Sequence, residues 1–159
     1  MRIAFDRWTQ IQECYESWWE GTLGRPIAHL AVVDSVEDTT ARLGPPPALE
    51  YTRFTGTYPE QVSTELIVDR YDWELARHRY VADGFPAAWP NFGAGVLAAL
   101  LGCSMKSGVE TIWFEPPATG AIEELRLWPH DMGGSVFRRI AEFYRVAVDY
   151  WNGSVQLGM

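Results

Sequence analysis

The chain has 159 residues, the size of one ordinary domain, and residues 1–159 are long enough to bury a sizeable core. With 47% apolar residues and a formal charge of −8, its composition is that of a folded protein that lacks the basic surface needed to neutralise nucleic-acid phosphates. No apolar stretch has the length of a bilayer span. We therefore expect a single domain with neither a nucleic-acid nor a membrane partner.

The first residues lack the apolar run and the small-residue cleavage site of a signal peptide. Cys14 and Cys103 are far apart and share no metal-binding spacing, so two free thiols in the reducing cytoplasm are the simplest account. The eight tryptophans are unusual, because large aromatic rings build both cores and ligand walls. An aromatic core and interface is the simpler reading of them, and ligand stacking is the alternative.

Apolar residues recur at steps of three and four near the N-terminus, which is typical of an amphipathic helix. Glycines and a proline end that helix, and a second proline followed by an acid suits the start of another one. The elements predicted for the first half are a helix over 5–20, a strand over 27–33, a loop or extended arm over 34–57, and a helix from 59 to about 80.

The second half begins with a predicted unit of strand, glycine-rich turn and helix, and a long amphipathic helix follows near its end. Ser135 is the expected N-cap of that long helix, because its hydroxyl can accept a hydrogen bond from a free backbone N–H. The elements predicted here are a strand over 85–89, a helix over 96–101, a strand over 110–115, a brief turn over 122–125, a helix over 135–151 and a strand over 154–159.

The last predicted strand, 154–159, is apolar and needs both a neighbouring strand and a covered face. Natural domain ends are usually polar and frayed. We therefore interpret the chain as a fragment-like piece that ends within a strand of a larger protein. The alternative is a genuine C-terminal edge strand that completes a sheet.

The turn Asn91-Phe92-Gly93-Ala94-Gly95 lies between a predicted strand and a predicted helix. It has neither the Gly-Lys-Ser/Thr of a phosphate-binding loop nor the third glycine of a dinucleotide fingerprint. A tight turn that needs glycine for its backbone is the simpler interpretation. Lining a ligand cleft is the alternative, because ligands of α/β folds collect beyond the carboxyl ends of strands.

The three histidines, His29, His78 and His130, are isolated and lack the spacing of a zinc site. His130 alone has an acidic neighbour, Asp131, in sequence. Two carboxylates stand at the edges of predicted strands and are candidates for acid–base work, with an ordinary solvated loop acid as the alternative. They are Asp83 and Glu115.

A family resemblance rests on the segment ADGFPAAWPNFGAGVLAALLG at 82–102, followed by ETIWFEPP at 110–117. Three further pieces accompany it: WWEG at 18–21, RPI at 25–27 and YWNG leading into VQLGM at 150–159. Together they make the chain similar to the N-terminal part of uroporphyrinogen-decarboxylase-like proteins. That superfamily also contains the corrinoid-dependent methyltransferases.

The resemblance implies an α/β fold, with an N-terminal helical extension and the first strands and helices of a (β/α)8 TIM-type barrel. A barrel of this kind takes roughly 250 residues, so it would be incomplete in this chain. The arginine-bearing R-Q-A-G-R-Y segment of uroporphyrinogen decarboxylases is missing, which favours the methyl-transfer branch. No cofactor is expected in this chain, and the resemblance allows zinc or a corrinoid in the full-length parent.

In such a barrel the turn and its flanks would face the barrel mouth and contact a small-molecule ligand; these residues are Phe85, Trp89, Asn91, Phe92 and Gly93. The catalytic residues remain unknown, and the piece alone is expected to be inactive. Two alternatives come from other classes. One is a stand-alone, non-catalytic domain that binds a flat or sugar-like ligand, and the other is an oligomerisation piece, since an open sheet edge favours self-association.

Overall fold

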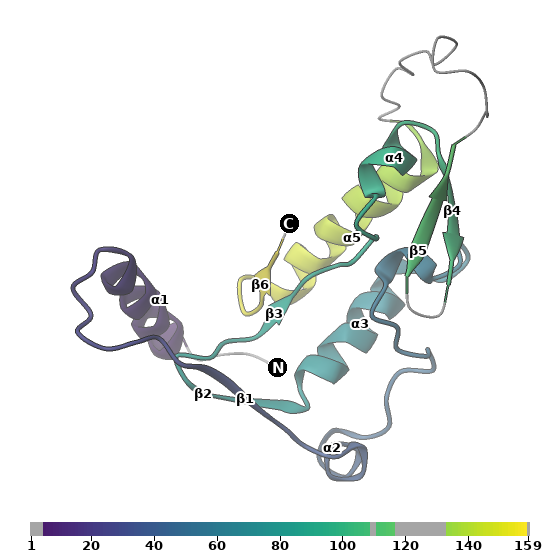
Figure 1. Ribbon diagram of the computed structural model, residues 1–159. Helices are drawn as coiled ribbons and strands as arrows, with labels where there is room; N and C mark the ends of the chain where they lie inside the picture. The colour runs from purple at the N-terminus through teal and green to yellow at the C-terminus, as the bar shows by residue number, and fades with distance from the viewer. Residues whose placement is uncertain (1–4, 109–110, 117–132, 159) are drawn as a thin grey trace.

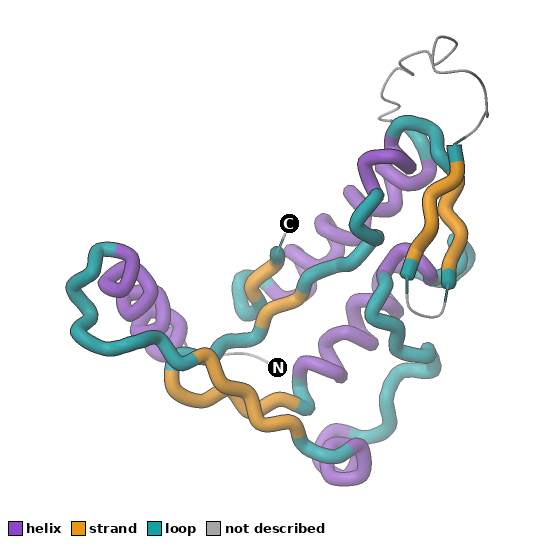
Figure 2. Tube along the Cα trace, viewed as in Figure 1, coloured by secondary structure: helices purple, strands orange, loops and turns teal. Residues whose placement is uncertain are grey.

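The structure is a computed structural model that describes residues 5–108, 111–116 and 133–158. Predictions placed on 122–125, His130, Asp131 and Met159 lie outside these residues. The described residues form helices and three two-stranded sheets, drawn in orange in Figure 2. The mixed helix-and-sheet character is therefore confirmed, and these strands do not close into a barrel within the described part of the chain.

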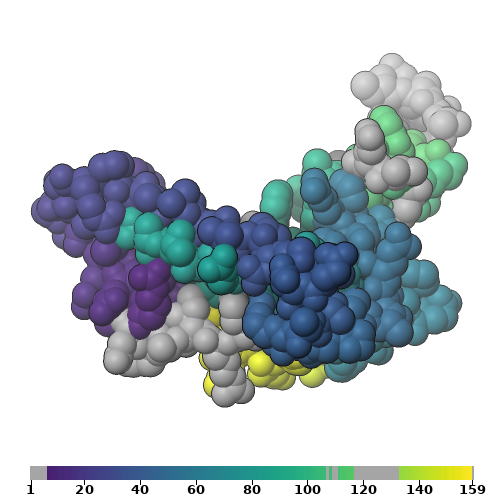
Figure 3. Space-filling view, turned by 90° about the horizontal axis from the view of Figure 1, so that it is seen from below, coloured from purple at the N-terminus to yellow at the C-terminus, as the bar shows by residue number. Residues whose placement is uncertain are grey.

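Helix α1, Phe5–Trp19, confirms the predicted N-terminal helix. It is followed by Gly21 and Gly24, whose φ angles of 73° and 67° reverse the chain in a conformation that favours glycine. The helix lies at one end of the molecule, with α4 at the other (Figure 1), and forms the purple end of the space-filling view (Figure 3). Its Ile11 is buried, whereas Trp18 and Trp19 are exposed.

Strand β1, His29–Val33, pairs antiparallel with β2, His78–Ala82, so that His29 lies opposite Ala82. The prediction of a helix continuing to about residue 80 is therefore wrong. The helix ends at Leu75, and Asp34 N donates to Arg77 O at 2.8 Å where the two chain segments meet. Pairing with a strand far away in the sequence overrides the local helical pattern here.

The predicted loop over 34–57 is also wrong, because it contains helix α2, Val36–Leu43, and the short 3-10 helix η1, Thr55–Thr57. Ser35 caps α2 by accepting a hydrogen bond from Asp38 N at 3.0 Å. Acidic residues in the first turn suit the positive end of the helix dipole. The Ser35 cap and these acidic residues therefore favour a helix at 36–43, even though the prolines that follow indicate a loop.

Helix α3, Thr64–Leu75, begins later than predicted. Ser63 is its N-cap and accepts from Leu66 N at 3.2 Å, so residues 59–62 lie before the helix. Its buried face contributes Ile67 and Val68 to the core.

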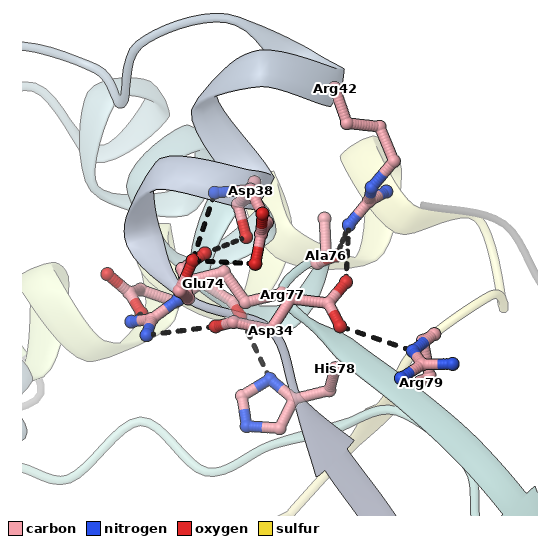
Figure 4. Close-up of polar contacts among 10 residues, drawn as sticks. Asp34, Asp38, Arg42, Glu74, Ala76, Arg77, His78 and Arg79 are labelled. Carbon is pink, nitrogen blue, oxygen red and sulfur yellow. Dashed lines mark hydrogen bonds and ion pairs between the residues drawn. The ribbon is translucent and has the colours of Figure 1, made fainter.

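A polar junction joins α2, α3, β1 and β2 around Asp34 (Figure 4). The Asp34 carboxylate accepts from Arg79 at 3.2 Å and from Arg42 at 3.4 Å. Arg77 forms an ion pair with Glu74 at 2.8 Å and also donates to the Asp34 carbonyl at 3.3 Å. These contacts hold the end of β1 against the end of α3.

The chain then passes through four short elements. They are β3, Ala87–Ala88; α4, Val96–Leu100; β4, Ser104–Ser107; and β5, Ile112–Glu115. The predicted strands and helix are present in shorter form, whereas β4 was not predicted. It pairs antiparallel with β5, with Ser104 opposite Glu115.

Helix α5, Ser135–Trp151, has the predicted bounds. Ser135 is not its cap, because Gly134 occupies that position and no side-chain capping bond is made there. The helix packs along α3, and Phe143 and Trp151 are almost fully buried in the core between them. After α5 the chain forms β6, Gln156–Leu157, which pairs parallel to β3.

Candidate functional site

The turn after β3 is held by its own polar groups. Asn91 Oδ1 accepts a hydrogen bond from Gly93 N at 2.9 Å, and the Asn91 carbonyl accepts from Gly56 N at 3.3 Å. Gly93 has a φ of 90°, a conformation that residues with a side chain rarely adopt. The first bond makes Asn91 the start of an Asx turn and ties it to the residue that needs glycine.

The glycines also allow the turn to lie directly against β5. A Cβ atom at Gly93 would come within 3.1 Å of Ile112 Cβ, and one at Gly95 would come within 2.6 Å of the Phe114 ring. Any larger residue at Gly95 would therefore have to displace that ring. The backbone conformation requires glycine at position 93, and the close approach of the Phe114 ring requires it at position 95. The simpler interpretation, a turn that needs its glycines for structural reasons, therefore accounts for both.

A groove of about 440 Å³ opens beside this turn, at the carboxyl end of β3. It is mostly apolar, and none of the described residues that line it is charged. They are Phe54, Trp89, Pro90, Asn91, Phe92, Gly93, Ala94, Val96, Thr111, Ile140 and Tyr144. The groove also lies near the carboxyl end of β6, since the Tyr144 hydroxyl donates to Gly158 O at 2.7 Å.

Four of the five predicted ligand-binding residues share this groove: Trp89, Asn91, Phe92 and Gly93. The side chain of Trp89 is 68% exposed, whereas Phe92 is buried and forms an edge-to-face contact with Phe143 in the core. The groove therefore has one exposed wall, at Trp89, and one wall fixed by the core, at Phe92. Burial raises the pKa of the Tyr144 hydroxyl, so it is a neutral hydrogen-bond donor near pH 7.

Phe85, the fifth residue, is not part of the groove. It lies in a separate aromatic cluster that packs α1 onto the rest of the chain, with ring centroids 5.4 Å from Trp8, 5.5 Å from Tyr15 and 4.9 Å from His29. Edge-to-face geometry in all three pairs is typical of aromatic packing. The position of Phe85 indicates a role in holding the N-terminal helix.

Asp83, a candidate acid–base group, is engaged by two partners. The Arg25 guanidinium donates to its two carboxylate oxygens at 2.7 and 2.8 Å, and Ala28 N donates to Oδ2 at 2.9 Å. These hydrogen bonds hold the pKa of Asp83 well below its usual range, and the pair raises the pKa of Arg25. A carboxylate so acidic is a weak proton acceptor, which favours a structural role.

Glu115, the other candidate, lies at the end of β5 and pairs with Lys106 at 2.6 Å on the surface. Its side chain is 51% exposed and it does not line the groove. The solvated alternative therefore fits it better than an acid–base role in this groove.

The described histidines have ordinary polar surroundings. His29 Nδ1 lies 3.4 Å from the Tyr15 hydroxyl, and His78 Nδ1 lies 2.9 Å from the Glu74 carbonyl. In the described part of the chain, no group of three or more His, Cys, Asp or Glu side chains could hold a metal ion. These residues therefore do not fit a zinc site.

Sequence reasoning missed the far side of the groove, where Phe54, Ile140 and Tyr144 come from distant segments. Ile140 and Tyr144 lie one turn apart on α5, so the sequence could predict that they share a face of the helix. It could not predict which segment packs against that face. Phe54 stood in a segment predicted to be a loop, and only tertiary packing brings it to the turn.

A second hollow, of about 400 Å³, lies between α2 and α3. Two carboxylates line it, but each already accepts a hydrogen bond from α5: Tyr150 donates to Asp69 and Trp151 to Asp72, both at 3.0 Å. The groove beside β3 is the better candidate site, because it lies where the two parallel strands end.

Across the described residues, no helix is both long and apolar enough to cross a membrane. No family model, no curated protein and no solved structure matches the chain.

Proposed function

We propose that the chain is the N-terminal segment of a uroporphyrinogen-decarboxylase-like enzyme that carries out methyl transfer or decarboxylation on a small molecule or a tetrapyrrole. In this proposal α1 and the β1–β2 pair belong to the extension, and β3 and β6 are the first two strands of a (β/α)8 barrel. The chain supplies part of the pocket wall and is not catalytically complete by itself. The parent is proposed to be a cytoplasmic enzyme.

The parallel pairing of β3 with β6 is the observation that carries this proposal. Parallel neighbours need a long crossover connection, usually containing a helix, and α5 delivers the chain into β6. Such strand–helix–strand units are the repeating pieces of a TIM-type barrel, whose ligands bind beyond the carboxyl ends of the strands. The groove lined by Trp89 and Asn91 is at this end of β3.

The chemistry of the groove favours methyl transfer over decarboxylation of a tetrapyrrole. A tetrapyrrole with several carboxylates calls for arginine or lysine side chains, and the described lining contains neither. An uncharged, apolar wall suits a small methyl-bearing ligand better. The described residues offer no set of metal ligands, so zinc or a corrinoid would be held by other residues of the parent. No chemical step that uses either group is assigned to this chain.

The test uses the parent protein expressed from its whole reading frame. Transfer of an isotopically labelled methyl group from methylcobalamin to a small thiol is measured beside release of carbon dioxide from uroporphyrinogen. We expect methyl transfer, and we expect Trp89→Ala to lower it while Trp19→Ala, an equivalent change on α1, leaves it unchanged. Carbon dioxide release alone would move the parent to the decarboxylase branch, and neither activity would overturn the proposal.

The second candidate is a stand-alone, non-catalytic domain for ligand binding or oligomerisation. The exposed apolar side chains of the β1–β2 pair favour it, because Leu30, Val32 and Val81 are 54%, 46% and 42% exposed on one face of that pair. Light scattering of the purified chain, combined with tryptophan fluorescence, distinguishes a ligand-binding domain from an oligomerisation piece. A ligand-binding domain is a monomer whose tryptophan fluorescence responds to ligand, and an oligomerisation piece is a dimer or larger without such a response.

A further inference from the structure

We propose that the groove beside β3 binds a quaternary ammonium group, that is, a fully methylated amine cation. This inference rests on the proposed function only in taking the groove to be the ligand site, and it goes further in naming the chemistry of the ligand. It is carried by three features of the groove: the aromatic residues that line it, the contacts that hold their rings, and the lack of any charged side chain among the described lining residues.

Four aromatic side chains line the groove, more than any other kind of residue there: Phe54, Trp89, Phe92 and Tyr144. The faces of such rings carry negative charge and attract a cation within about 6 Å of the ring centroid, most strongly for tryptophan. Trp89 is 68% exposed and is therefore open to a ligand. Aromatic residues from the turn after β3, from α5 and from the segment before η1 border one space, as in the aromatic cages that bind methylated ammonium groups.

Neighbouring contacts hold three of these rings before any ligand arrives. Tyr144 is anchored by its hydroxyl, which donates to Gly158 O at 2.7 Å, and Phe92 packs on Phe143 with ring centroids 6.4 Å apart. Trp89 lies beside Gly158, where an added Cβ would be 3.5 Å from its Cδ1 atom. Rings that are already ordered lose little entropy on binding, which strengthens a weak individual attraction.

The polar groups of the groove select for a cation that needs no hydrogen bonds. Asn91 Oδ1 already accepts from Gly93 N at 2.9 Å, and the Tyr144 hydroxyl proton is already donated. A primary ammonium would find no carboxylate among the described lining residues, and a carboxylate ligand would find no charged donor there. A quaternary ammonium has no N–H group, and the chain's net charge of −8 favours the approach of a cation.

Isothermal titration calorimetry of the chain compares choline with 3,3-dimethyl-1-butanol, which has the same shape but carries carbon in place of the charged nitrogen. We expect choline to bind about fivefold to thirtyfold more tightly, the range that one to two kilocalories of cation–ring attraction provides. Equal affinities would overturn the proposal in favour of a neutral apolar ligand. Absence of choline binding would overturn it as well.

The variants locate the binding. Trp89→Ala is expected to weaken choline binding about tenfold, whereas Trp89→Phe keeps a ring and retains most of the affinity. Trp19→Ala is the matched control, because Trp19 lies on α1 and is also exposed, and this change is expected to leave binding unchanged. Choline binding that survives Trp89→Ala would overturn the assignment to this groove. Binding without methyl transfer by the parent would reject the proposed function alone, and methyl transfer without choline binding would reject this inference alone.

Discussion

Arg25 and Asp83 are joined by two parallel hydrogen bonds, 2.7 and 2.8 Å long, across 58 positions of the sequence. Arg25 stands just before β1 and Asp83 just after β2, so the pair closes the β1–β2 sheet at the end opposite the Asp34 junction. Asp83 is only 4% exposed, and it also accepts from Ala28 N at 2.9 Å. One carboxylate thus binds a side chain and a backbone group of the same segment.

Replacing Asp83 by alanine is expected to lower the free energy of unfolding by about 1–3 kcal/mol, because the Ala28 N–H loses its acceptor. Urea denaturation followed by circular dichroism measures the change. The control is Glu115→Ala, which breaks the exposed pair with Lys106 and is expected to cost less than about 1 kcal/mol. Equal losses in the two variants would contradict the structural role of Asp83.

The contribution of Asp83 is also expected to depend on pH. Its pKa is lower in the folded chain than the value of about 4 of an unfolded aspartate, so the unfolded chain takes up the proton first as pH falls. The stabilisation is therefore complete above about pH 5 and declines progressively below about pH 4. The difference in unfolding free energy between the native chain and Asp83→Ala should shrink from pH 6 to pH 3, and a constant difference would refute the assignment.

Gly93→Ala and Gly102→Ala form a matched pair, because the two glycines have φ angles of 90° and 96°. An added Cβ at Gly93 would lie 3.1 Å from Ile112 and Phe114 atoms, whereas nothing lies within 4 Å at Gly102. Both variants should lose about 1 kcal/mol from backbone strain. Gly93→Ala should lose about 1–3 kcal/mol more from overpacking. Thermal unfolding of both variants tests this, and similar melting temperatures would show that crowding at the turn is unimportant.

Phe143 connects the core to the groove, since its ring meets both Tyr71 and Phe92. Its side chain is 1% exposed, so Phe143→Ala should destabilise the chain by about 3–5 kcal/mol through lost burial and a cavity. Val148→Ala, on the same helix but 56% exposed, should change stability by less than about 0.5 kcal/mol. Chemical denaturation measures both, and a small effect of Phe143→Ala would show that α5 does not anchor the core.

The sequence predicted α1 and α5 well because both carry long apolar stripes, and in α5 that stripe meets the core at Phe143 and Trp151. It failed at β2, because the partner strand β1 lies far away in the chain and the residues at 78–82 lack a clear alternation. It also failed at α2, where the cap formed by Ser35 and Asp38 was readable but the following prolines dominated the interpretation.

The candidate site was partly predictable for a related reason. The turn from Asn91 to Gly95 is local, so a strand followed by glycines and a helix was sufficient to identify it. Phe54 and Tyr144 reach the groove only through the packing of η1 and α5, which no local pattern contains. Phe85 shows the opposite case, because adjacency to β3 in sequence does not place its ring at the same end of the strand.

The β1–β2 sheet has a consequence for how the molecule opens. It consists of two strands, every residue of β1 is exposed, and the segment between the strands contains α2 and α3. A two-stranded sheet in which one strand is exposed along its whole length is marginal in water. The amide hydrogens of β1 and β2 should therefore exchange with deuterated solvent much faster than those in the buried half of α5, through openings that leave the core intact. Hydrogen–deuterium exchange followed by mass spectrometry would then divide the chain into a rapidly exchanging β1–β2 sheet and a slowly exchanging core around α5.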